Sequence, residues 1–380
     1  MKIMLIPVLT EPEYRSYLWA KQAMEGITQE ATRRKYKIVT LDAETYETID
    51  YDKLFGSERR MLIIIGTSAS WMPRALTFFT KLGIETVFIS FDPAEVMLPT
   101  GMVRMDYVGA TLHLLTYLSV DCARKRIAMY GFNPNSSADR IKLRFFQQWG
   151  KNADHAVAED IFYNLADLQD CFRQFLPQVN KYDAVICSND VVGVSLLSML
   201  KQAEIRVPED LYAAAYGNSM ISERITPSLT IVTLDHPETG RQAVLLFSHL
   251  CKMPATACVS SRVRSKLIVR ASTANVADTA NDSAARSGVC ENASSVNFYS
   301  DPEAERLLRA ETLLNTCDDT DMRLIGGLLA GSSLDALEQA LYLTTSALQY
   351  RKKRLMHVVK CQHTGEFVDF LKFCRDKGIM

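Results

Sequence analysis

The sequence carries almost no net charge. Its 43 Lys and Arg residues nearly balance 44 Asp and Glu residues, which leaves a formal net charge of -1. A protein with so little net charge has no global field that draws it to nucleic acid or to an anionic membrane. Any attraction to such a partner must therefore come from a local cluster of basic residues.

Long apolar runs are also missing. No run approaches the roughly 20 apolar residues that a membrane-spanning helix needs, so we expect no membrane partner. The apolar run from Ile3 to Leu9 follows Lys2, as in a secretory signal, but it is short and contains Pro7. It leads into acidic residues without a small-residue cleavage site. We predict that this run forms the first strand.

The cysteines show no pattern of a metal site. There are nine of them, with no C-x-x-C pair and no Cys/His cluster at zinc spacing. Their number is odd, and several, such as Cys187, lie inside apolar runs. This pattern predicts reduced, mostly buried thiols in a cytoplasmic protein and no bound metal.

Common catalytic motifs are absent as well. The sequence has no Walker-type phosphate loop, no G-x-G-x-x-G, no G-x-S-x-G and no H-E-x-x-H, and its six histidines are dispersed. We therefore expect neither an enzyme nor a bound cofactor.

What is present is a regular alternation of strands and helices. In its clearest unit, the apolar runs Ala184–Cys187 and Leu211–Tyr216 read as buried strands on either side of a helix. Asn189 and Asn218 follow these strands, at the carboxyl ends where open α/β sheets bind ligands. The repeated alternation predicts parallel sheets with right-handed crossovers. The other predicted strands include Ile3–Val8, Lys37–Leu41, Met61–Ile65, Thr86–Ser90, Arg126–Tyr130 and His155–Glu159.

Four segments of the chain resemble the effector-binding core of LacI/GalR-type regulators and type I periplasmic sugar-binding proteins. They follow the order of that family: Tyr182–Asp190, Arg206–Gly217, Pro227–Val232 and the closing strand Leu267–Thr273. The resemblance spans about residues 1–273. It implies an α/β fold, namely a two-lobed type I periplasmic-binding-protein-like sensor made of two parallel sheets with flanking helices.

The resemblance and the composition together divide the chain into three parts. The residues from 274 to 300 are rich in Ala, Ser, Asn and Asp, which predicts a flexible linker. The residues after the linker predict a small all-α domain. The expected parts are a ligand-binding sensor at 1–273 (lobe 1 about 1–124 and 236–258; lobe 2 about 125–235 and 259–273), the linker at 274–300, and a helical domain at 301–380.

The resemblance also implies that a small polar ligand, sugar-like in character, binds in the cleft between the lobes. Paired donors and acceptors on carboxylate, amide and guanidinium groups suit vicinal hydroxyls, and an aromatic ring such as Trp19 or Phe162 suits the face of a sugar. The family usually has Asp at the position of Asn218, which points to a ligand other than a simple pentose or hexose. The candidate effector contacts are Tyr17, Trp19, Ser68, Asp92, Arg140, Phe162, Asn189, Asn218 and Asp235.

Each of these candidates has a simpler interpretation. An Asn or Asp at a strand end is often only a helix cap, which applies to Asn189. An isolated aromatic residue such as Trp19 or Phe162 is more often part of the core than a stacking platform.

The C-terminal residues 323–374 resemble a LuxR-type helix-turn-helix. The matching pieces are Leu328–Gly331, Leu334–Leu343, Thr345–Arg354 and Thr364–Val368. The resemblance implies that the second helix enters the DNA major groove. Four residues would lie near the groove, and two or three of the four consecutive cations that follow would reach phosphates. The candidate DNA contacts are Thr345, Ser346, Gln349, Tyr350, Arg351, Lys352, Lys353 and Arg354.

Two readings of the C-terminal segment remain open. A run of four cations is commonly a solvated helix face, and the alternative for the whole segment is a dimerisation bundle that does not contact DNA. The first reading of the chain is a cytoplasmic, ligand-responsive regulator of transcription that forms a homodimer and binds a sugar-like effector and double-stranded DNA. The alternative is a small-molecule receptor that signals through protein partners, with the C-terminal helices as a docking or dimerisation module.

Overall fold

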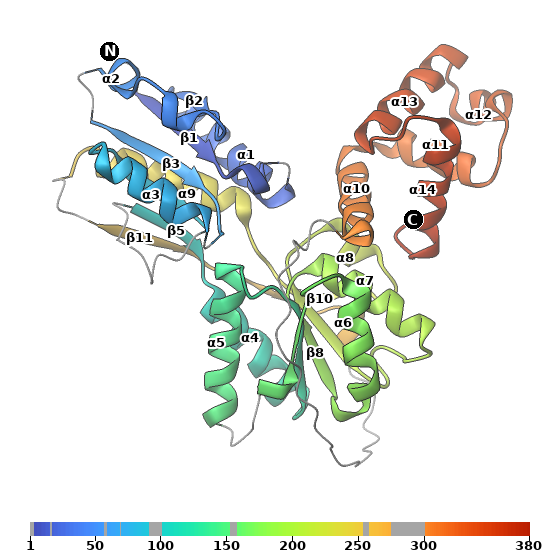
Figure 1. Ribbon diagram of the computed structural model, residues 1–380. Coiled ribbons are helices and arrows are strands. Elements are labelled where there is room, and N and C mark those ends of the chain that lie inside the picture. The colour runs from blue at the N-terminus through green and yellow to red at the C-terminus, as the bar shows by residue number, and fades with distance from the viewer. Residues whose placement is uncertain are drawn as a thin grey trace. The chain divides into compact units, whose positions relative to one another are not determined.

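The computed structural model describes residues 4–15, 17–56, 59–68, 70–90, 101–152, 158–253, 258–274 and 301–380. The chain divides into two compact units, each assembled from three stretches of sequence. The first unit comprises residues 1–113, 133–158 and 233–266, and the second comprises residues 114–132, 159–232 and 267–380 (Figure 1).

The first unit is built on a six-stranded, all-parallel sheet with the strand order β11-β5-β4-β3-β1-β2. All five residues of its central strand β3 (Met61–Ile65) are buried, as expected for a parallel strand covered on both faces. The other strands are β1 (Leu5–Thr10), β2 (Lys37–Leu41), β4 (Glu85–Ile89), β5 (Gly101–Met105) and β11 (Val259–Val263). The helices are α1 (Leu18–Arg33), α2 (Tyr51–Phe55), α3 (Trp71–Lys81), α4 (Tyr107–Thr116, which continues into the second unit), α5 (Ser137–Asn152) and α9 (His236–Leu250).

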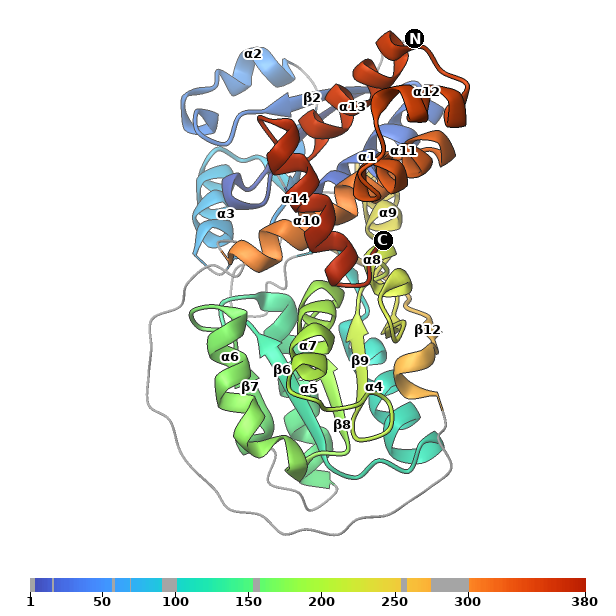
Figure 2. The same ribbon diagram turned by 90° about the vertical axis from the view of Figure 1, so that its right-hand side faces the viewer.

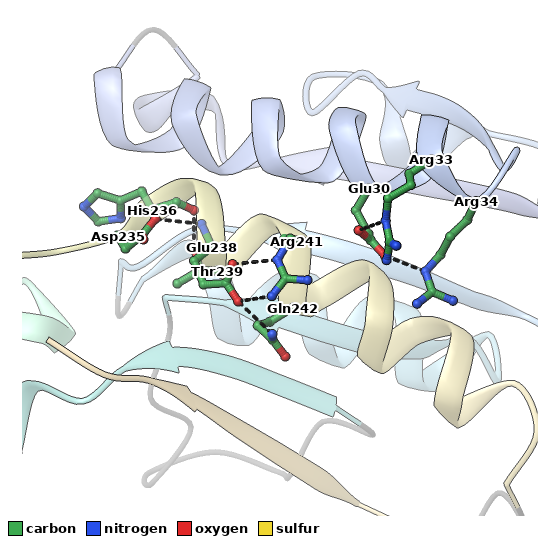
Figure 3. A network of polar contacts seen from close by, with 9 residues as sticks. All are labelled: Glu30, Arg33, Arg34, Asp235, His236, Glu238, Thr239, Arg241 and Gln242. Atoms are coloured by element: carbon green, nitrogen blue, oxygen red, sulfur yellow. Dashed lines mark hydrogen bonds and ion pairs between the residues drawn. The ribbon is translucent and has the colours of Figure 1, made fainter.

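Helices α1 and α9 of the first unit pack backbone against backbone. A Cβ atom on Gly26 would lie 1.9 Å from the carbonyl oxygen of Pro237, and one on Gly240 would lie 1.8 Å from that of Ala23. Only glycine permits so close an approach. Glu30 of α1 is satisfied within its own helix, since it accepts hydrogen bonds from the two arginines that follow it (Figure 3). This contact fixes where α9 begins, and therefore where its first residues lie.

The second unit holds a six-stranded sheet with the order β12-β10-β9-β8-β6-β7. Its pairs are parallel except for β10 and β12, which are antiparallel. Its strands are β6 (Ile127–Phe132), β7 (Ile161–Tyr163), β8 (Ala184–Cys187), β9 (Tyr212–Tyr216), β10 (Thr230–Val232) and β12 (Leu267–Ile268). Its helices include α6 (Leu168–Phe175), α7 (Asp190–Gln202) and α8 (Met220–Arg224). Two parallel-dominated sheets with flanking helices confirm the predicted fold class.

The C-terminal residues 301–380 belong to the second unit and form five helices that pack beside its sheet and helices. These are α10 (Pro302–Thr316), α11 (Asp319–Leu329), α12 (Leu334–Leu341), α13 (Thr345–Val358) and α14 (Thr364–Asp376). Helix α10 contacts α7 and α8, as Figures 1 and 2 both show. Buried residues of α7 such as Leu196 belong to the same apolar cluster as Leu307 of α10 and Phe367 of α14. The helical region therefore shares a core with the second unit.

Three sequence-based expectations need correction or fall outside the described residues. Strand β11 pairs with β5, so Val259–Val263 belongs to the sheet of the first unit rather than to lobe 2. The strand predicted at His155–Glu159 lies further along the chain, at Ile161–Tyr163, while Glu159 is in a 3-10 turn. Nearly all of the predicted linker, 275–300, lies outside the described residues.

Candidate functional site

A buried carboxylate organises the strand ends of the first unit. Glu11 follows β1 and is only 1% exposed. Its side chain accepts hydrogen bonds from the backbone amides of Thr67 (2.9 Å) and Ser68 (3.2 Å) and from the hydroxyl of Ser68. Burial raises the pKa of Glu11, although these hydrogen bonds oppose the shift. Ser68, a predicted effector contact, is therefore held by Glu11, and Glu11 itself was missed because an acidic residue after a strand is usually exposed.

An aromatic cluster lies beside this carboxyl end. The ring centres of Tyr14 and Tyr17 are 5.3 Å apart, those of Tyr14 and Trp19 are 5.5 Å apart, and those of Trp19 and His236 are 6.0 Å apart. Tyr17 and Trp19, both predicted effector contacts, are half-buried. The structure therefore brings these two residues into one cluster with a histidine from the start of α9.

His236 is the polar group of this cluster that sequence reasoning did not find. Its Nδ1 is buried and has no hydrogen-bond partner among the residues that the structure describes. Burial, with a smaller contribution from the charge of Lys142, lowers the pKa of His236 to about 4. The ring is thus neutral near pH 7. A buried ring nitrogen without a partner costs free energy, which a ligand hydroxyl or amide at this position would recover.

Asp235, the neighbour that was predicted as an effector contact, has a local role. Its side chain is exposed and accepts a hydrogen bond from the amide of Glu238 at 3.0 Å, which caps α9 (Figure 3). This cap matches the simpler interpretation of an Asp at a strand end.

The start of α5 reaches the end of β3. The hydroxyls of Ser137 and Thr67 are 2.9 Å apart, and Ser136 forms an isolated antiparallel bridge with Ser68. Arg140, a predicted effector contact one turn further on, is half-buried, and its guanidinium donates to the carbonyl of Pro134 at 3.4 Å. Arg140 therefore lies on the helix that the end of β3 anchors.

The strand ends of the second unit carry two asparagines. Asn189 caps α7, because its Oδ1 accepts from the amide of Val192 at 3.0 Å, and its Nδ2 donates to the hydroxyl of Ser188 at 3.4 Å. The cap interpretation therefore applies to Asn189. Asn218 is exposed, and its Oδ1 accepts from Arg270 at 3.5 Å. Arg270, from the closing segment of the sensor, is a polar neighbour that sequence reasoning missed.

Asp190 ties these two strand ends together. Its carboxylate accepts from the amide of Val191 at 3.0 Å and from that of Ser219 at 2.7 Å. Gly217 has a φ of 141°, and a Cβ atom there would lie 2.3 Å from Asp190 Oδ2. The loop after β9 thus closes over a buried carboxylate, whose pKa burial raises.

Two predicted effector contacts do not join these groups. Phe162 lies on β7, is 5% exposed, and packs edge-on against Phe175 and Tyr182 with ring centres 5.0 and 5.8 Å away. No face of its ring is open to a ligand, so a stacking role for Phe162 does not fit the structure. The strand is displaced relative to the prediction, which turns this side chain into the core. Asp92 lies outside the described residues.

Helices α12 and α13 are joined by a tight turn. Helix α12 ends at Tyr342, which adopts a left-handed conformation with a φ of 55°, and Thr344 caps α13 by accepting from the amide of Ala347 at 3.3 Å. The hydroxyl of Thr345 donates to Glu338 of α12. Two helices with a short turn between them are the arrangement that a helix-turn-helix requires.

Two of the four consecutive cations on α13 are engaged inside the helical region. Nη1 of Arg351 lies 2.8 Å from Asp318 Oδ2 and 2.8 Å from Asp321 Oδ1, and Arg354 is paired with Asp321. These two acids form the capping box of α11. Lys353 is exposed and Lys352 is half-buried. The other candidates for DNA contact on this helix are all exposed: Thr345, Ser346, Gln349 and Tyr350.

The chain resembles known regulators over most of its length. Residues 123–273 match a family model described as a periplasmic binding protein-like domain. The NTD biosynthesis operon regulator NtdR of Bacillus subtilis (strain 168) is 30% identical over 272 residues, which cover 66% of this chain and 77% of NtdR. The chain belongs to the LacI/GalR-like family of periplasmic-binding-protein-like sensors.

Other regulators resemble the chain at lower sequence identity. The ribose operon repressor of Escherichia coli (strain K12) is 26% identical over 147 residues, so the chain spans 44% of that protein. The structure of the transcriptional regulator CelR in complex with cellobiose matches with 19% identity and a TM-score of 0.58, and the match covers 71% of this chain and 84% of the CelR chain. The structure of the Lac repressor dimer bound to operator and the anti-inducer ONPF matches with 16% identity and a TM-score of 0.58, and the match covers 71% of this chain and 94% of the repressor chain.

The family match covers part of the sensor, namely residues 123–273. The family model ends at Thr273, so the helical region at 301–380 lies outside it. Among the described residues, no helix combines the length and the apolar character needed to cross a bilayer.

Proposed function

We propose that this protein is a ligand-responsive, DNA-binding regulator of transcription. Its sensor would bind a small polar metabolite at the carboxyl ends of its parallel strands, and its helix α13 would contact DNA. The proposal places the protein in the cytosol, without catalytic activity, and assigns it a homodimeric state. NtdR, the ribose operon repressor and CelR are regulators by name, which supports the class of function.

The observation that carries the effector proposal is the pairing of Trp19 with His236. An indole ring offers a flat apolar face, and a buried imidazole nitrogen without a partner offers one hydrogen bond. A sugar ring has an apolar C–H face and hydroxyls around its edge, so it fits both groups. Within the second unit taken by itself, Asn218 and the Nδ2 of Asn189 are amide groups at strand ends that can hydrogen-bond to hydroxyls.

The effector proposal is tested by ligand-induced thermal stabilisation of the full chain. The first probes are D-ribose and cellobiose, followed by other sugars and polar metabolites. A ligand at 100 times its Kd stabilises the folded state by about 2.7 kcal/mol, which raises the melting temperature by several degrees. We expect Trp19→Phe and His236→Phe to reduce this rise.

A matched control separates binding from general damage. Trp149 stacks on Phe146 with ring centres 6.0 Å apart, away from the aromatic cluster, so Trp149→Phe should keep the ligand-induced rise. A panel of sugars and polar metabolites that gives no rise with the unchanged protein contradicts the effector proposal.

The exposed face of α13 supports the DNA proposal. Gln349 and Tyr350 are exposed on the same helix as Lys353, so base-edge and phosphate contacts are available side by side. The test is selection of bound sites from random double-stranded DNA by the purified full chain. A homodimer should select two related half-sites whose centres are separated by about one helical turn or a multiple of it.

A second function remains a candidate because Arg351 and Arg354 are held by Asp318 and Asp321. With two of its four cations engaged, α13 has a weaker attraction for phosphate, which favours a receptor that signals through protein partners. DNA affinity that is the same for every sequence at physiological salt would support this alternative.

A further inference from the structure

Within the second unit, the helical region contacts the sensor helices through two buried carboxylates, Asp301 at the cap of α10 and Glu311 in α10. Asp301 is 5% exposed, and its Oδ2 accepts from the amide of Leu168 at the start of α6, at 2.7 Å. Glu311 is 3% exposed and accepts from the amides of Met220 (3.0 Å) and Ile221 (2.9 Å) at the start of α8. Each acid therefore binds the amino end of a sensor helix, where backbone N–H groups have no partner within the helix.

The contact of Glu311 continues directly into a candidate effector site. The loop after β9 runs from Gly217 to Ser219 and leads into α8, and two carboxylates hold three consecutive amides at this junction. Asp190 of the sensor takes the amide of Ser219 at 2.7 Å, and Glu311 of the helical region takes the next two. The residue just before these three is Asn218, which the proposed function assigns to the effector.

Glu311 is held in place by its own helix. The Nδ2 of Asn315 donates to Glu311 Oε1 at 2.8 Å and to the carbonyl oxygen of Glu311 at 2.9 Å. Both carboxylate oxygens of Glu311 are therefore hydrogen-bonded, and a shift of α10 would move the acceptor of two loop amides. A buried amide that loses its acceptor costs about 1–3 kcal/mol, so the loop and the helix are expected to move together.

We infer that Glu311 is a positioning residue, which sets the loop that carries Asn218 and thereby links the helical region to the strand ends of the second unit. The inference rests on the proposed role of Asn218 in the effector site. Because coupling between two sites is reciprocal, an effector that moves this loop would shift α10, and α10 contacts α13. The link passes through α8 and α10.

The test uses the full chain alone, without effector or DNA, so its outcome is independent of the proposed function. Backbone and side-chain amide signals are recorded by NMR for the unchanged protein and for Glu311→Gln, which keeps the shape of the side chain but removes one acceptor. We expect the amides of Met220 and Ile221 to exchange with solvent at least about 10-fold faster, as the loss of one buried hydrogen bond predicts. The decisive signals are the backbone and side-chain amides of Asn218, which should also shift.

Control and support variants complete the design. Glu305→Gln makes the same change of charge on an exposed position of the same helix and should leave the signals of residues 217–221 unchanged. Glu311→Ala should give larger shifts at Asn218 than Glu311→Gln. If Glu311→Gln does not fold, Asn315→Ala removes only the donor that holds the carboxylate and should give smaller shifts at the same positions. Changes confined to α10 and its two bound amides, with Asn218 unmoved, would overturn the inference.

Discussion

Arg351 of α13 bridges Asp318 and Asp321, the two acids of the capping box that begins α11. A single guanidinium nitrogen lies within 3.0 Å of both oxygens of Asp318 and 2.8 Å from Asp321 Oδ1, and Asp321 is fully buried. The arginine thus fixes α13 against α11, and α13 is the helix assigned to DNA. Arg351, which was predicted from the sequence to contact DNA phosphates, thus pairs with Asp318 and Asp321 and orients α13.

We expect Arg351→Ala to lower the free energy of unfolding by about 1–3 kcal/mol, because it removes a partner from the buried carboxylate of Asp321. Arg354 still pairs with this acid, which limits the loss. Urea unfolding measures the change. Lys353→Ala, on the exposed face of the same helix, should stay within about 0.5 kcal/mol of the unchanged protein, and equal losses in the two variants would contradict the bridging role.

The double variant Lys352→Ala with Lys353→Ala should weaken DNA binding without this loss of stability. Each phosphate contact contributes about 0.9 to the slope of log K against log salt, so we expect the slope to become shallower by about 2. Fluorescence anisotropy with a selected DNA site at several salt concentrations measures it. Lys372→Ala on α14 is the control with equal loss of charge per residue, and an unchanged slope in the double variant would argue against phosphate contacts by α13.

His236 makes stability depend on pH in a defined window. Its pKa is about 4 in the folded protein and near 6.5 in an unfolded chain. The unfolded state therefore binds a proton at a higher pH than the folded state. The neutral, buried His236 therefore does not reduce the free energy of unfolding above pH 6.5. As the pH falls from 6.5 towards 4, protonation of this histidine in the unfolded state lowers the free energy of unfolding by about 3 kcal/mol.

Urea unfolding between pH 7 and pH 4 should show this dependence as a difference between two proteins. In His236→Phe the component from the imidazole is absent, so the stability of the variant should fall less steeply than that of the unchanged protein. The carboxylates titrate in both proteins and cancel in the comparison. Parallel curves would mean that the ring is not buried as a neutral group.

Gly240→Ala should disrupt the contact of α1 with α9. The added Cβ would lie 1.8 Å from a backbone carbonyl oxygen, and a helix backbone cannot yield as a flexible side chain can. We expect a loss of more than about 3 kcal/mol, measured by thermal unfolding. Gly326→Ala is the matched control, since nothing lies within 4 Å of a Cβ at that helical position, and it should stabilise α11 by up to about 1 kcal/mol.

Local sequence patterns predicted those elements whose burial follows from apolar periodicity. The predicted strands Met61–Ile65 and Ala184–Cys187 have the same bounds in the structure. Strand β11, with the sequence VSSRV, alternates between buried or half-buried and exposed residues at the edge of its sheet, so it offers no apolar run to find. The displacement of β7 by a few residues was enough to move Phe162 from a strand end into the core.

The polar residues that sequence reasoning missed share one property. Glu11, His236 and Glu311 are acidic or basic side chains with buried polar atoms whose surroundings are formed by distant segments. Glu11 receives its amides from residues 56 and 57 positions away, and Glu311 from residues 90 and 91 positions away. Without the fold, such residues are indistinguishable from exposed charges, whereas caps such as Asn189 and Asp235 are recognisable because their partners are local.

The contact between Glu311 of α10 and the amides of α8 limits where the chain can be divided in domain exchanges. A chimaera that fused residues 301–380 to a foreign sensor would contain Glu311 without the two helix amides that it binds here. In the reverse exchange, the amides of Met220 and Ile221 would lose their carboxylate acceptor. An exchange of domains between such proteins therefore has to transfer α8 together with α10. A fusion point just before residue 301 would separate Glu311 from the two amides of α8 that it binds.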